Sequence, residues 1–119
     1  MEKTFRVIFR ASDYLASVVF YRELLGLPVE RTWDSGPTQK GTIFAAGSGF
    51  IEVLTADAEH KPPCGVEIYF PVPDVDAYAE ALRARGAILH SPPTDKPWGH
   101  RTVSVLDPDG LRVIAYSEI

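Results

Sequence analysis

The 119-residue sequence has little cysteine, little histidine and no excess of positive charge. Its single cysteine, Cys64, cannot form an internal disulfide or build a thiolate metal site. Twelve basic residues against 16 acidic ones give a net charge of −4, which argues against a basic surface for nucleic acids. No apolar run approaches the roughly 20 residues of a membrane span, and the opening MEKTFRVIF lacks the apolar core of a signal peptide. We therefore expect a cytoplasmic protein without nucleic-acid or membrane partners.

The composition is otherwise that of an ordinary globular protein, with 45% hydrophobic and 24% charged residues. A chain of this length buries roughly two-thirds of its unfolded surface without disulfides or metals. We expect a single domain over residues 1–119. Ten prolines and nine glycines predict many short elements joined by turns.

The first half of the chain predicts one helix among four strands. TFRVIFR alternates apolar and polar residues, which is typical of a strand with one buried face. Ser12 or Asp13 is placed to cap a helix that runs through YLASVVFYRELL and ends at Gly26. Three further strands are predicted at about residues 29–33, 42–46 and 50–55.

The same pattern returns after a polar linker at residues 57–64. GVEIYFPV predicts a strand, and a helix begins at Asp74 or Asp76 and ends at Gly86. The helix-ending glycines, Gly26 and Gly86, are 60 residues apart. Further strands are predicted at about residues 87–90, 101–106 and 111–116, the last two joined by an Asp-Pro-Asp-Gly turn. The chain thus predicts two βαβββ modules, at about residues 4–56 and 65–117.

One helix cannot cover both faces of a four-stranded sheet. The uncovered face must be buried elsewhere or line a cavity. We therefore predict an α+β protein in which the curved mixed sheets of two tandem βαβββ modules enclose a cavity.

SDYLASVVFYRELLGL after the first strand, together with DPDG in the last hairpin, resembles the vicinal oxygen chelate superfamily. This superfamily includes glyoxalase I, extradiol dioxygenases, fosfomycin-modifying enzymes and bleomycin resistance proteins, and the resemblance covers nearly the whole chain. Its enzymes take metal ligands from the first and last strands of each module. The matching positions in this sequence are Arg6, Glu52, Glu67 and Ile114.

Two of these four positions cannot bind a metal, because a guanidinium and an aliphatic side chain offer no lone pair. His60, His90 and His100 fall outside the matching positions. We therefore expect no metal, no cofactor and no catalytic residue.

Strand parity places Arg6, Glu52 and Glu67 on the cavity side of their sheets. We expect the guanidinium to bind both carboxylates in an ion-pair cluster. The alternative is that all three are partly exposed strand residues bonded to water.

Trp98 precedes the last hairpin in PWGHRTVSVLDPDG. This stretch is similar to the antibiotic-binding branch of the superfamily, whose members lack a metal and hold a drug at a dimer interface. A rigid indole suits stacking on a flat ligand, and Gly99 allows a close approach. The alternative is that Trp98 covers one end of the core. Trp33 is the matching aromatic residue of the first module, and Tyr69 and Tyr116 share the parity of the cavity wall.

The sequence favours a binding protein over an enzyme. We predict metal-free binding of a small, partly aromatic molecule, such as an antibiotic, in a cleft between the modules of a homodimer. The alternative to the homodimer is a monomer whose own two modules close on each other. One alternative is a metal-dependent lyase, isomerase or dioxygenase of the same superfamily that uses Glu52, Glu67 and other ligands. His100, next to Trp98, could serve as a general base, but a single histidine in a loop usually faces solvent. Another alternative is a scaffolding subunit whose cavity is filled by its own side chains. The candidate ligand-binding residues are Trp98, Trp33, Arg6, Glu52, Glu67, Tyr69 and Tyr116.

Overall fold

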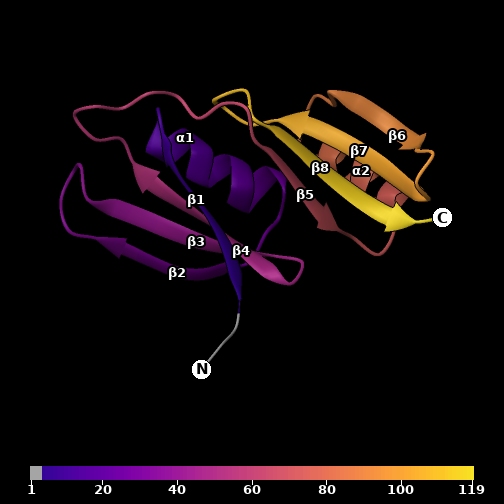
Figure 1. The fold of residues 1–119 in the computed structure, drawn as a ribbon, viewed down its shortest axis with the longest axis horizontal. Helices are drawn as coiled ribbons and strands as arrows, with labels where there is room; N and C mark the ends of the chain where they lie inside the picture. Colours follow the sequence, from indigo (N-terminus) through magenta and orange to yellow (C-terminus); the bar gives the residue numbers. More distant parts are fainter. Residues whose placement is uncertain (1–3) are drawn as a thin grey trace.

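The computed structural model describes residues 4–119, which form two modules of the same design (Figure 1). The first module contains β1 (Phe5–Ala11), α1 (Tyr14–Val19), β2 (Val29–Asp34), β3 (Lys40–Ala46) and β4 (Gly49–Thr55). The second contains β5 (Glu67–Pro71), α2 (Val75–Ala84), β6 (Ser91–Asp95), β7 (His100–Leu106) and β8 (Arg112–Glu118). The predicted α+β class and the two βαβββ modules are confirmed.

Each module folds into a four-stranded mixed sheet. The strand orders are β1-β4-β3-β2 and β5-β8-β7-β6, and in each sheet the first strand runs parallel to the last. The two sheets lie side by side along the long axis of the molecule, with β1 and β5 nearest the middle (Figure 1). They are not closed on each other, so the space that the sequence predicts takes the form of open pockets.

Aspartates begin both helices. The carboxylates of Asp13 and Asp74 accept the backbone N–H groups of Ala16 and Ala77, each at 3.1 Å. The first helix does not run to Gly26 as a regular α-helix, because residues 20–24 form a π-helical turn. None of the helices in residues 4–119 has the length and apolar character that a membrane span requires.

The helix-facing sides of both sheets share one apolar core. Tyr21 is fully buried, and its hydroxyl donates to the Asp107 carboxylate of the second module at 2.8 Å. Tyr78 of α2 reaches the other way and donates to the Leu25 carbonyl at 2.7 Å. These two hydrogen bonds join the modules across a core that includes Phe9, Val18, Phe20, Phe44, Ile51, Val53, Ile68, Phe70, Val75, Leu82, Val103 and Val113.

One strand lies elsewhere than expected. The sequence predicts a strand at residues 87–90, whereas β6 occupies Ser91–Asp95 and contains Pro92 and Pro93. This position is tolerated because β6 is the outer strand of its sheet, where a missing N–H breaks no ladder. The register with β7 shifts between Ser91 and Thr94, which is where the prolines lie.

Candidate ligand-binding site

Each sheet has one face packed on the core and one face turned away from its helix, which we call the open face. In the second sheet, Ile68, Val113 and Ala115 face the core. Alternate residues therefore project from the open face. The register places Tyr69 opposite Ile114, Ser104 opposite Ile114, and Thr102 opposite Tyr116 on this face.

Three rings stack on the open face of the second sheet. The rings of Tyr69 and Tyr116 lie 4.8 Å apart between centroids at an interplanar angle of 26°. The His100 imidazole continues the stack 4.1 Å from the Tyr116 ring, at 16°. Such near-parallel pairs stabilise one another beyond the area they bury.

Hydrogen bonds attach Trp98 to this stack. Its indole N–H donates to the Tyr69 hydroxyl at 3.2 Å, and the Tyr69 hydroxyl lies 2.7 Å from His100 Nδ1. His100 Nε2 in turn lies 4.0 Å from Glu118 Oε1. Trp98 remains 61% exposed and is not part of the apolar core. Trp98 therefore does not cover one end of the core, which was the alternative to its contacting a ligand.

The open face of the second sheet contains a pocket of about 340 Å³. Thr102 and Ser104 lie at its floor, 4% and 5% exposed, and supply hydroxyl groups. Trp98 and Tyr69 supply aromatic surface. The lining residues are Glu67, Tyr69, His90, Ser91, Lys96, Trp98, Thr102, Ser104, Arg112 and Ile114.

The expected three-residue ion-pair cluster is only half present. Arg6 Nη1 binds Glu52 Oε1 at 2.8 Å, and Glu52 is buried on the open face of the first sheet. Glu67 pairs instead with Arg112 at 3.0 Å. The reason is the register, which makes Glu67 and Arg112 direct partners on β5 and β8. Each module thus neutralises its own charges.

Trp33 lies apart from this site. It belongs to β2 and packs over Gly41 of β3, where a side-chain Cβ would meet the indole. The Arg31 guanidinium lies 5.9 Å from the centroid of the Trp33 ring. Within residues 4–119, Trp33 and Trp98 therefore line different pockets.

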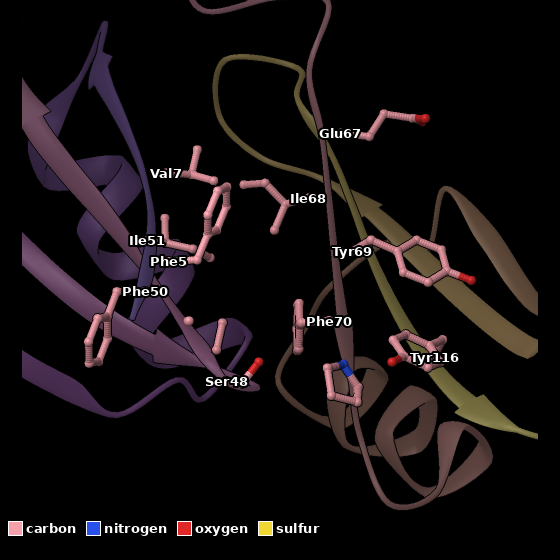
Figure 2. Close-up of a pocket in the computed structure, with 13 residues that line it drawn as sticks. Phe5, Val7, Ser48, Phe50, Ile51, Glu67, Ile68, Tyr69, Phe70 and Tyr116 are labelled. Carbon is pink, nitrogen blue, oxygen red and sulfur yellow. The ribbon is translucent and has the colours of Figure 1, made fainter. Parts of the chain in front are cut away.

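The open face of the second sheet points away from the first module, as the close-up of the cleft between the modules shows (Figure 2). Ile68 and Phe70 of β5 point toward Phe5 and Ile51 of the first module. Tyr69, Glu67 and Tyr116 point away from it. The intermodule cleft, about 400 Å³, is lined by core-side residues such as Val7, Ile51 and Ile68, and at its edges by Phe50, Glu67, Tyr69 and Tyr116 of the open faces. Because the open face of the second sheet turns away from the first module, one chain does not close one open face with the other.

The sequence profile of the Glyoxalase/Bleomycin resistance protein/Dioxygenase superfamily matches residues 4–114. The chain belongs to this superfamily. An uncharacterised protein of Bacillus subtilis (strain 168), YraH, is 28% identical over 120 residues, which span 90% of this chain and 91% of YraH.

Two solved structures of similar fold cover almost the whole chain. TnmS3, described as an antibiotic binding protein from Streptomyces sp. CB03234, superposes with a TM-score of 0.80 at 21% identity and covers 100% of this chain and 98% of its own. TioX from Micromonospora sp. ML1 gives a TM-score of 0.79 at 21% identity, covering 99% and 100%. At this identity, the likeness establishes the fold.

The metal chemistry found in this superfamily does not fit the residues at the matching positions. The side chain of Arg6 is itself a cation at a position where a metal ligand would be needed, and Ile114 has no donor atom. The carboxylates of Glu52 and Glu67 are each bound to an arginine of their own module. Within residues 4–119 no cluster of three or more histidine, cysteine, aspartate or glutamate residues has a geometry that could hold an ion.

His100 is the residue at this site that the sequence argument undervalued. It lies within the strand, with its side chain 23% exposed, and it is not a loop residue facing solvent. Its alternation with Thr102 and Ser104 was the available signal. That alternation puts His100, Thr102 and Ser104 on the open face of the second sheet.

Proposed function

We propose that the protein binds a small, flat, partly aromatic molecule without a metal, in the pocket on the open face of its second sheet. The observation that carries the proposal is the exposed Trp98, held by Tyr69 beside a hydroxyl-lined pocket. A side chain that is more than half exposed and yet held in place has its stacking surface free for a ligand. The volume lies within the usual range for small-molecule sites.

An antibiotic or another planar toxin fits this chemistry. The rings supply apolar contact, while Thr102, Ser104 and Lys96 supply polar contacts that orient a ligand. The shared fold of TnmS3, itself an antibiotic binding protein, supports this ligand class. Binding in the cytoplasm would protect a cell by lowering the concentration of the free compound, with no covalent chemistry required.

Replacing Trp98 is the direct test of this site. We expect Trp98→Ala to weaken the binding of a planar aromatic antibiotic about tenfold, because the main stacking surface is lost. Trp98→Phe, which keeps an aromatic face, should lose only about two- to threefold. Isothermal titration calorimetry against a panel of planar antibiotics measures both. Equal affinities of the wild-type protein and Trp98→Ala for every antibiotic that binds would remove Trp98 from the site.

We further propose that a second copy of the chain covers the open faces. The open face of the first sheet presents the cations Arg6, Arg10 and Arg31 beside the buried Glu52, together with Ile8, which is 55% exposed. The open face of the second sheet presents Glu67 and Glu118 beside Arg112. Arg6, Arg10 and Glu67 are paired within the chain, with Glu52, Asp57 and Arg112. Arg31 of the first face and Glu118 of the second have opposite charges, and they can complement each other when the first module of one copy faces the second module of its partner in a homodimer. The pocket would then lie at the interface between the two copies.

Substitution of Ile8 tests this arrangement. We expect Ile8→Glu to convert the dimer to a monomer, because the new charge would be buried between the faces. Leu15→Glu is the matched control, since Leu15 is 68% exposed on α1, away from both open faces. Sedimentation velocity gives the masses. A wild-type protein that stays monomeric at all concentrations, or a dimer unaffected by Ile8→Glu, contradicts the proposal.

A further inference from the structure

The hydroxyl of Tyr69 is the centre of a short chain of hydrogen bonds on the pocket wall. A phenol has one proton to donate and oxygen lone pairs to accept with. The Trp98 N–H occupies one lone pair at 3.2 Å. The contact of 2.7 Å with His100 Nδ1 requires one proton between the two atoms. Whether Tyr69 or His100 supplies that proton decides what Tyr69 can offer a ligand.

The carboxylate of Glu118 favours Nε2 as the protonated nitrogen of the neutral His100 ring. Glu118 Oε1 lies 4.0 Å from Nε2, and a nearby carboxylate favours an N–H that points toward it. Nδ1 is then an acceptor, and Tyr69 donates to it. The titratable side chains that contact the ring are Tyr69 of β5 and Tyr116 and Glu118 of β8. Lys96 contacts His100 through its backbone N–H, which donates to the His100 carbonyl at 2.7 Å.

We propose that Tyr69 offers the pocket only a lone pair while His100 is neutral, so that the site selects an aromatic ligand with a hydrogen-bond donor, a phenolic hydroxyl or an N–H. This inference rests on the proposed function and specifies its ligand. The proton of Tyr69 is engaged with Nδ1, and one lone pair is engaged with Trp98. A ligand carbonyl or ether at this position would face another oxygen lone pair, which is repulsive.

Protonation of His100 reverses this preference. The imidazolium takes its second proton from water and carries it on Nδ1, from which it donates to the Tyr69 oxygen. That oxygen now accepts from both Trp98 and His100, and the Tyr69 proton turns toward the pocket. With His100 protonated, the site therefore prefers a ligand that accepts a hydrogen bond.

The tautomer of His100 can be measured without any ligand. Long-range ¹H–¹⁵N correlation spectra of the full chain, assigned with His100→Gln, distinguish protonated from unprotonated ring nitrogens. At about pH 8, above the usual histidine range, we expect a protonated Nε2 and an unprotonated Nδ1. A neutral ring protonated on Nδ1 would overturn the inference, whatever the protein binds.

Two naphthalene probes that differ by one O-methyl group test the selectivity. At about pH 8 we expect 2-naphthol, which can donate, to bind about fivefold more tightly than 2-methoxynaphthalene, a difference typical of one hydrogen bond. The preference should disappear in Tyr69→Phe, which keeps the ring and removes the hydroxyl. Tyr14→Phe is the matched control and should keep the preference, because its hydroxyl binds Thr42 in the first module.

The outcomes separate the two proposals. Equal affinity for both probes in the wild-type protein contradicts donor selection while leaving aromatic binding intact. A preference that survives in Tyr69→Phe assigns the selection to another group and overturns the role of Tyr69. Binding of neither probe contradicts the proposed function and the inference that rests on it.

Discussion

Replacing Tyr21 by phenylalanine is expected to lower the free energy of unfolding by about 2–3 kcal/mol. The substitution keeps the ring, which packs among Phe9, Phe20 and Phe44, and removes only the hydroxyl. That hydroxyl donates to the carboxylate of Asp107, which is only 5% exposed. Without it, a carboxylate oxygen is left in the core with neither protein nor bulk water to bind it.

The loss should be large because Asp107 links the last hairpin to the first module. Its second oxygen accepts the backbone N–H groups of Asp109 and Leu111, each at 2.9 Å. Asp109 in turn accepts the backbone N–H of Ser12 at 3.1 Å. The DPDG segment is thus a hairpin turn that also joins the two modules. Tyr21→Phe therefore weakens a contact between the modules as well as a hydrogen bond.

Urea unfolding followed by circular dichroism measures the effect, with Tyr14→Phe as the control. Tyr14 loses a bond to the neutral hydroxyl of Thr42, so its cost should stay near 1 kcal/mol or below. In an Asp107→Ala background, Tyr21→Phe should cost little more, because the partner is already absent. Equal costs for Tyr21→Phe and Tyr14→Phe would show that the Asp107 carboxylate is not left unsatisfied.

The local features of the fold could be predicted from the sequence because their causes are local. Asp13 and Asp74 cap the helices through their own neighbouring N–H groups. Alternation along β1 and β4 placed Arg6 and Glu52 on the same face, and the structure joins them in an ion pair. The DPDG turn follows from the conformations that proline and glycine allow.

Features that depend on pairing between distant strands were missed. Glu67 and Arg112 are 45 positions apart in the sequence, and only the register of β5 with β8 makes them partners. The stacking of His100 on Tyr116 depends in the same way on the pairing of β7 with β8. The strand expected at residues 87–90 lies instead at Ser91–Asp95, where two prolines are tolerated because β6 is at the edge of its sheet.

The direction in which the open faces point could not be predicted from the sequence either. Side-chain parity shows which residues share a face, but the angle between two sheets is set by how their cores dock. Here the docking contacts are between helix-side residues of both modules, reinforced by Tyr21 and Tyr78. This docking turns the pocket beside Trp98 outward, where the first module of the same chain does not cover it; the proposed second copy would do so.

Tyr78 also makes stability depend on alkaline pH. Burial raises the pKa of Tyr78 to about 12, although Arg85 nearby opposes the shift. Burial, and after it the charge of Asp107, raises the pKa of Tyr21 as well. In an unfolded chain both tyrosines titrate near pH 10. Between about pH 10 and pH 12 the unfolded chain therefore loses protons that the folded chain keeps, and the free energy of unfolding falls as the pH rises.

Each tyrosine should lower the free energy of unfolding by about 1.4 kcal/mol per pH unit in this window, and it should add no pH dependence well below pH 10. We expect Tyr78→Phe to be less stable than the wild-type protein near pH 7, because the Leu25 carbonyl loses its donor. The gap should then narrow by about 1.4 kcal/mol per pH unit above pH 10, since phenylalanine has no proton to lose. Urea unfolding at intervals of half a unit measures the two curves, and the titration of lysines and the other tyrosines, common to both proteins, cancels in the difference. Parallel curves would mean that Tyr78 ionises as readily in the folded chain as in the unfolded one, and that its bond to Leu25 opens in alkali without separating the modules.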